Sequence, residues 1–217
     1  MTRMTIALLF VTCTAYGQTQ EQKDSLINVM CQTFISTEAL ADTARIGYTF
    51  ENHVVTFLGR YPEDKRQELL HGIFIRFQRT CPEFKAFIDR MDPPKGDWKI
   101  VDKKPSPMLN KSACRQFLAH QKFAYMESSG DTVRLEIANG FWIDHFRDGT
   151  FSKLKLQWIS DCEFEIEFME SNNDTRRNFS KPGDKYVYQV VDKKAGYYDI
   201  SVEIKGTGRY SLFRLYY

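Results

Sequence analysis

The stretch Trp158-Ile-Ser-Asp-Cys-Glu-Phe-Glu-Ile-Glu-Phe168 decides the fold class of this chain. Its second half alternates strictly, with Cys162, Phe164, Ile166 and Phe168 on one side and Glu163, Glu165 and Glu167 on the other. A period of two is typical of a β-strand that buries one face. Residues 152–158 alternate in the same way, with apolar residues at Leu154, Leu156 and Trp158. The two segments together predict a β-hairpin with one buried face.

The length of the loop in this hairpin decides which side chains lie opposite each other. A three-residue loop over 159–161 places Trp158 opposite Cys162 and Leu156 opposite Phe164, and it sets lysines against glutamates. A two-residue loop would place Leu156 opposite Glu165 and mix the two faces, so it is excluded. A five-residue loop also keeps the faces separate and remains open.

Length and composition indicate an ordinary folded protein with an aromatic core. The chain has 217 residues, of which 42% are apolar, 27% charged and 14% aromatic. This size corresponds to one large or two small domains, and the aromatic fraction favours a β core packed with rings. The net charge is only +2, so binding to nucleic acid has no electrostatic support.

Residues 1–17 have the features of a secretory signal peptide. Arg3 supplies a positive charge, residues 4–11 form an apolar core, and Ala15-Tyr-Gly17 is a small-x-small cleavage site. The apolar run is shorter than the ~20 residues that a membrane span needs. We therefore expect an exported chain, in the periplasm or outside the cell, without a stable membrane span. The alternative is a lipoprotein acylated at Cys13, but the residues before this cysteine fit the acylation motif poorly.

Four cysteines follow the signal segment, an even number that suits disulfides in an oxidising compartment. Cys31 and Cys81 lie in the N-terminal half, and Cys114 and Cys162 lie in the C-terminal half. Three pairings are possible, and this division favours Cys31–Cys81 and Cys114–Cys162. No C-x-x-C or H-x-x-x-H spacing occurs, so a zinc site is disfavoured. The sequence predicts neither a metal nor a cofactor.

Residues 18–92 predict a small helical bundle. The first helix carries an apolar stripe at helical spacing, made of Leu26, Ile27, Met30, Cys31, Phe34 and Ile35. A second helix is predicted over 38–58, a third from Pro62, and a short fourth from Pro82. Residues 93–113 are rich in proline and lysine, which predicts a linker.

Residues 114–217 predict an antiparallel β-meander. Turn sequences such as Asn139-Gly140 and Asp148-Gly149 separate the strands, and a long polar loop is predicted over 171–183. The strands are expected at 115–126, 132–138, 140–147, 151–159, 162–169, 185–192, 197–205 and 208–217. The fold class is therefore α+β, with a helical bundle followed by about eight strands in a curled sheet or a small barrel.

Two resemblances accompany this pattern. Cys114-x-x-Phe117, Lys122-Phe-x-Tyr125 and Trp158-Ile-Ser-Asp-Cys-Glu-Phe164 resemble landmarks of secreted Bacteroidota proteins that have a cysteine-containing helical segment before a lipocalin-like β domain. This resemblance implies a periplasmic or surface location and brings no catalytic residue with it. Separately, Gly96-Asp-Trp98 is similar to the G-x-W motif that opens lipocalin barrels.

Groups that could perform chemistry are scattered along the sequence. Glu68-x-x-His71 has metal-pair spacing on a helix, but it lacks partner ligands and is better interpreted as a solvated face. Trp142, Asp144 and His145 could form a polar spot, yet strand alternation puts His145 on the opposite side from the other two. The three glutamates of the hairpin are best explained as a charged outer face. Catalysis needs clustered reactive groups, so an enzyme is the least favoured class.

The favoured function is an exported, non-enzymatic binding or interaction module. Its partner would be a small apolar ligand, a peptide or an envelope protein. The alternatives are a structural envelope protein without a ligand and a lipocalin-like carrier of a small apolar molecule. Bulky aromatics predict a mostly filled interior, with any ligand shallow and either at an open end or in the groove between sheet and helices. Residues 171–183 and the linker are the expected edges of that groove. The candidate ligand-facing residues are Trp142, Trp158, Phe164, Tyr198 and Tyr210.

Overall fold

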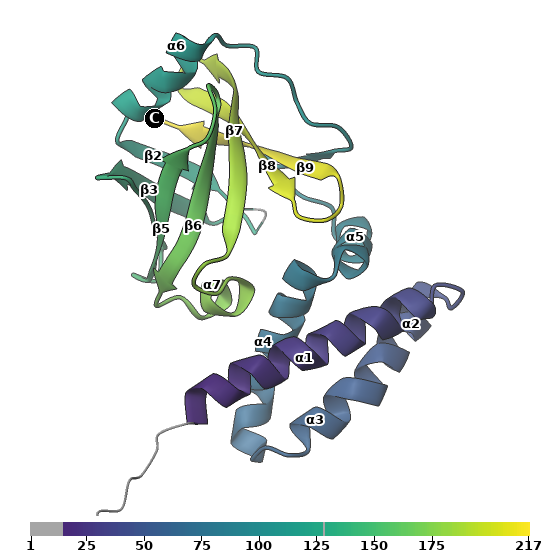
Figure 1. The fold of residues 1–217 in the computed structure, drawn as a ribbon. Coiled ribbons are helices and arrows are strands. Elements are labelled where there is room, and N and C mark those ends of the chain that lie inside the picture. The colour runs from purple at the N-terminus through teal and green to yellow at the C-terminus, as the bar shows by residue number, and fades with distance from the viewer. Residues whose placement is uncertain (1–14, 128) are drawn as a thin grey trace, which may run out of the picture.

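The computed structural model describes residues 15–127 and 129–217. Helices make up the first part of the chain, and an antiparallel β-barrel makes up the last part, as the α+β prediction expected. Figure 1 shows the helices below one end of the barrel and helix α6 at the other end. The predicted signal segment at 1–17 and the alternative lipid site at Cys13 lie outside the described residues, except for the last three residues of that segment, which begin helix α1.

The helical part packs around a cluster of phenylalanine rings. Its helices are α1 (Ala15–Ser36), α2 (Asp42–Phe50), the π-helix η1 (Glu51–Val55), α3 (Thr56–Leu58), α4 (Glu63–Thr80) and α5 (Pro82–Met91). Phe34 lies fully buried at the centre. Beside it, the rings of Phe77 and Phe84 stack on each other with centroids 4.1 Å apart. The second helical segment begins at Asp42 rather than at residue 38, because residues 37–40 form a turn after α1.

The Cys31–Cys81 disulfide is present and joins α1 to the junction between α4 and α5. Two cysteines 50 residues apart in sequence lie with their Cα atoms 5.5 Å apart. In the chain-entropy account, closing a loop of this length stabilises the folded state by about 4 kcal/mol. The cross-link therefore supports a helical core too small to depend on burial alone.

The barrel is built from strands that follow one another along the chain. They are β2 (Lys122–Met126), β3 (Thr132–Ala138), β4 (Phe141–His145), β5 (Phe151–Trp158), β6 (Glu163–Ser171), β7 (Lys185–Lys194), β8 (Tyr197–Ile204) and β9 (Arg209–Tyr216). Each pairs antiparallel with the next, and β9 also pairs with β2, which closes the ring. The short strand β1 (Lys99–Val101) occupies the rest of the free edge of β9.

The central hairpin has the five-residue loop that the sequence left open. Trp158 lies opposite Phe164, and Leu156 lies opposite Ile166, so the three-residue register is wrong by two positions. Cys162 instead lies in the loop, where it is bonded to Cys114 and its carbonyl accepts from the Val190 N–H. The backbone N–H groups of Ile159 and Ser160 both donate to the Glu163 carbonyl and close the longer loop. The buried and charged faces stay separate, as alternation requires.

The region predicted as the start of the first barrel strand is helical instead. Residues 111–115 form α6 (Lys111–Arg115) and residues 116–119 form the 3₁₀-helix η2 (Gln116–Ala119), so the strand begins only at Lys122. The Asn110 side chain accepts a hydrogen bond from the Ala113 N–H at 2.9 Å and caps α6. Phe117 enters the barrel and stacks 4.8 Å from Phe123. The Cys114–Cys162 disulfide joins α6, just before Phe117, to the loop between β5 and β6.

Two segments predicted to be irregular contain regular structure that closes the other end of the barrel. Residues 171–183 form helix α7 (Asp174–Phe179), whose N-cap Asn173 accepts from the Arg176 N–H at 3.1 Å. Within 93–113, β1 pairs with β9, and Trp98 stacks on Phe213 with ring centroids 4.4 Å apart. The division of the chain into 18–92, 93–113 and 114–217 stays a prediction.

None of the described helices is both long enough and apolar enough to cross a membrane. The two disulfides are bonds that persist in oxidising, extracytoplasmic compartments.

The faces of the central hairpin give a stability prediction. Phe164 is fully buried, so Phe164→Ala should lower the free energy of unfolding by about 3–5 kcal/mol. Glu165 forms an outer ion pair with Lys185 at 2.8 Å, so Glu165→Gln should change it by less than about 1 kcal/mol. Urea unfolding followed by tryptophan fluorescence measures both values, since Trp142 belongs to the barrel core cluster and Trp98 and Trp158 pack against it. Equal losses from the two variants would contradict the assignment of the faces.

Candidate functional site

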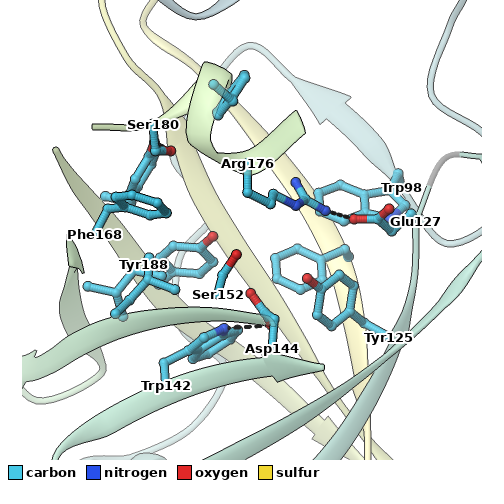
Figure 2. Close-up of a pocket in the computed structure, with 15 residues that line it drawn as sticks. Trp98, Tyr125, Glu127, Trp142, Asp144, Ser152, Phe168, Arg176, Ser180 and Tyr188 are labelled. Atoms are coloured by element: carbon cyan, nitrogen blue, oxygen red, sulfur yellow. Dashed lines mark hydrogen bonds and ion pairs between the residues drawn. The ribbon is translucent and has the colours of Figure 1, made fainter. Parts of the chain in front are cut away.

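A cavity of about 130 Å³ lies inside the barrel at the end covered by α7. Its walls come from inward-facing residues of β2, β4, β5, β6, β7 and β9, and its cover comes from α7 and Trp98. Figure 2 shows the polar groups of Asp144, Ser152, Tyr125 and Tyr188 directed toward the same space. The cavity adjoins α7, within 171–183, and Trp98, within 93–113, which are the two segments expected at the edges of a ligand site. That they border a ligand site stays a prediction.

Asp144 is the buried acid of this cavity. It lies on β4, two residues after Trp142, so strand alternation turns both side chains into the barrel. The indole Nε1 of Trp142 donates to Asp144 Oδ1 at 3.0 Å, and the Tyr125 hydroxyl is its second hydrogen-bond partner. Burial raises the pKa of Asp144 to about 7, although the hydrogen bonds from Trp142 and Tyr125 lower it in part. Near neutral pH this carboxyl can therefore be charged or neutral.

Aromatic side chains form most of the wall around Asp144. Trp142 and Tyr188 lie with ring centroids 5.5 Å apart, and Tyr188 meets the edge of Phe213 at 6.1 Å. Trp98 covers the other face of this group by stacking on Phe213, and its indole N–H donates to the Met126 carbonyl. Burial also raises the pKa values of Tyr125 and Tyr188, so both phenols stay neutral at physiological pH. The result is a ring-lined space with the buried carboxyl of Asp144 in its wall and Glu127 and Arg176 at its rim.

The rim of the cavity carries an ion pair. Arg176 of α7 pairs with Glu127, which follows β2, and its guanidinium lies 5.0 Å from the centre of the Phe146 ring. Ser180, just after α7, hydrogen-bonds the Tyr186 hydroxyl. Helix α7 is thus attached to two sides of the barrel rim and acts as a lid over the cavity.

The helical part of the chain holds this lid in place. Buried Arg76 of α4 donates to the Phe179 carbonyl at 2.7 Å and to Asp184 Oδ2 at 2.9 Å. Gly72, one turn earlier, lies so close to α7 that a Cβ there would come within 2.5 Å of Asn178 Oδ1. Gly72 therefore leaves room for the Asn178 side chain, and Arg76 fixes the end of α7.

The five candidate ligand-facing residues lie in different places. Trp142 lines the cavity. Phe164 and Tyr198 are fully buried in the filled end of the barrel, where Phe117 contacts both rings. Trp158 packs against Phe164, and Arg115 covers its ring at 4.4 Å. Tyr210 has the parity opposite to the buried Phe213 and Leu215 of β9, so it lies on the outer face.

The sequence treated Asp144 only as part of a polar spot and missed the cavity that it lines. Alternation did place Asp144 with Trp142 and away from His145, which lies outside at 4.0 Å from Glu136. A carboxyl on an otherwise apolar strand face was the available signal. A second signal was Trp98, which belongs to the G-x-W motif Gly96-Asp-Trp98.

Other clusters in the described part of the chain offer little chemistry. Glu68 and His71 are exposed on α4. Cys31, Cys81 and Glu83 lie close together, but both sulfurs are used in the disulfide and cannot ligate a metal. The hairpin glutamates form outer-face ion pairs, such as that of Glu165 with Lys185.

The chain matches no protein-family model, no curated protein and no solved structure.

The buried carboxyl predicts a specific pH dependence of stability. The pKa of Asp144 is about 7 in the folded protein and about 3.9 in an unfolded chain. The folded state therefore binds more protons, and stability falls as pH rises from about 4 through 7. Asp144→Asn removes this loss, so its free energy of unfolding relative to wild type should rise between pH 5.5 and pH 8. Urea unfolding at the two pH values measures the difference.

Asp148 is a suitable control for this experiment because its carboxyl is exposed and its pKa is lowered by hydrogen bonds from Thr150. Asp148→Asn should give the same difference from wild type at both pH values. A constant difference for Asp144→Asn would show that Asp144 does not titrate in this range.

The attachment of the lid predicts a local effect on dynamics. Arg76→Ala removes the donor to Phe179 and Asp184, so backbone amides in 174–180 should exchange hydrogen faster. Arg177→Ala is the matched control, because Arg177 is exposed and its ion pair with Asp174 lies within the same helix. Hydrogen exchange with mass spectrometry measures both. Unchanged exchange in 174–180 would mean that α4 does not hold α7.

Proposed function

We propose that this protein is an exported binding protein whose barrel holds one small ligand in the cavity under α7. The observation that carries the proposal is the cavity itself, in which hydroxyls and a buried carboxyl converge inside an aromatic wall. Small-molecule sites combine mostly apolar walls with a few placed polar groups. A barrel that served only as a solid scaffold would gain stability by filling this space, as it does at the Phe117 end.

The size of the cavity limits the ligand. Cavities of about 150 Å³ accept a molecule the size of benzene, and drug-sized ligands occupy about 300–1,000 Å³. At about 130 Å³, the space suits a ligand with one ring or an equivalent volume. This argues against a fatty-acid carrier and keeps the lipocalin-like alternative only for very small molecules.

Export is part of the proposal. It is supported by the two disulfides and by the signal-like residues 1–17. The resemblance to secreted Bacteroidota proteins supports a periplasmic or extracellular location.

Blocking the cavity tests the binding function. Ser152 is buried in the cavity wall opposite Asp144, so Ser152→Leu should fill the space. Ser201→Leu is the matched control, because Ser201 is equally buried but does not line the cavity. Native mass spectrometry should detect a bound small molecule on wild type and on Ser201→Leu, and none on Ser152→Leu. A wild-type protein that never carries a ligand, even after incubation with a small-molecule library, would favour a structural envelope role.

A further inference from the structure

Asp144 is a buried acid without a cationic partner in the described part of the chain. Its hydrogen-bond partners, Trp142 and Tyr125, are neutral donors. The positive group at the rim, Arg176, is already paired with Glu127. A buried carboxylate is stabilised most by a positive charge at close range. Among the described residues, no positive charge is therefore left over to lie against Asp144.

The wall around this carboxyl is suited to a cation. The faces of tryptophan and tyrosine rings attract cations, most strongly where water is excluded. Trp142, Tyr188 and Trp98 all line the cavity, and Tyr125 lies beside Asp144. The hydroxyl oxygens of Tyr188 and Ser152 point into the same space as the carboxyl (Figure 2). An ammonium group has three N–H donors, and these three oxygens can accept them.

We propose, on the basis of the binding function above, that the ligand is a small organic monocation, namely a protonated primary amine with a ring-sized apolar group. Its ammonium lies against Asp144, and its apolar part lies among the rings of Trp98, Trp142 and Phe213. An anion is disfavoured because it would meet the carboxylates of Asp144 and Glu127. A neutral ligand leaves the acid without a counter-charge.

The proposal predicts how affinity depends on pH. An ammonium binds the ionised form of Asp144, whereas a neutral acceptor such as an alcohol oxygen or carbonyl binds the protonated form. The other ionisable groups that line the cavity are Tyr125, Tyr186, Tyr188, Arg176 and Glu127. Tyr125 and Tyr188 stay neutral, the Tyr186 hydroxyl hydrogen-bonds Ser180, and Arg176 and Glu127 are paired. With a pKa near 7 for Asp144, amine affinity should rise by roughly tenfold or more between pH 5.5 and pH 8.

Three probes of nearly equal size separate the possibilities: benzylamine, benzyl alcohol and benzoate. Isothermal titration calorimetry of the full chain at pH 7.5 should show binding of benzylamine at least tenfold tighter than that of benzyl alcohol, and no binding of benzoate. Asp144→Asn keeps an oxygen acceptor for Trp142 and removes the charge, so it should abolish the preference for the amine. Asp148→Asn, outside the cavity, should retain it. Circular dichroism confirms that each variant is folded.

The outcomes distinguish this inference from the proposed function. If benzyl alcohol or benzoate binds wild type as tightly as benzylamine, the cavity binds ligands but the cationic class is wrong. If none of the three binds, the cationic proposal is overturned, and native mass spectrometry of wild type and Ser152→Leu decides the binding function separately. The pH series on wild type is independent of any variant: benzylamine affinity that is flat or falls from pH 5.5 to pH 8 would overturn the role of Asp144.

Discussion

The Cys114–Cys162 disulfide is the constraint on which the layout of the barrel depends. It fixes helix α6 to the β5–β6 loop, and this placement sends Phe117 into one end of the barrel. An eight-stranded barrel is just wide enough to be filled by its own side chains or to hold one small ligand. In this barrel, side chains fill one end, and a small cavity lies at the other. The Phe117 end is solid, so any open space must lie at the opposite end, under α7.

The open end breaks a rule that the rest of the interior obeys. Elsewhere the inward positions carry rings and aliphatic groups, such as Phe164, Ile166 and Leu215. At Asp144 the chain places an acid among them, and burial of an unpaired carboxylate opposes folding. Sequences depart from local consistency mainly at functional sites. Because the Asp144 carboxyl faces the cavity, a bound ligand could offset the unfavourable free energy of burying it.

Most of the strand pattern could be predicted because half-buried strands alternate strictly and their turns contain glycine or asparagine. The alternation of residues 162–168 and of 197–205 led to strands whose bounds agree with the structure to within two residues. The segment 115–119 was wrongly predicted as strand. Asn110 was a local sign of a helix start that the prediction did not use, and the predicted Cys114–Cys162 disulfide does not by itself say whether the residues after Cys114 are helical.

The candidate site was only partly predictable for a related reason. Parity placed Trp142 and Asp144 on the same inward face, which is correct. The alternation of a strand cannot tell which inward residues meet a filled core and which meet open space. That depends on Phe117, which fills one end of the barrel, and on α7, which covers the other. Trp158 and Tyr198 were therefore grouped with Trp142, although they lie in the filled end. Trp98 was assigned to a linker, because its role needs the partner Phe213 from the far end of the chain.

The helical part gains a role from its contact with α7. Arg76 and Gly72 of α4 position the helix that carries Arg176, and Arg176 closes the rim through Glu127. Arg176, Glu127 and α7 thus border the cavity on this side. Because α4 belongs to the core that the Cys31–Cys81 disulfide stabilises, the lid is attached to a rigid support instead of lying on a free loop. The packing between the helices and the barrel therefore sets the position of α7 beside the cavity that Asp144 lines.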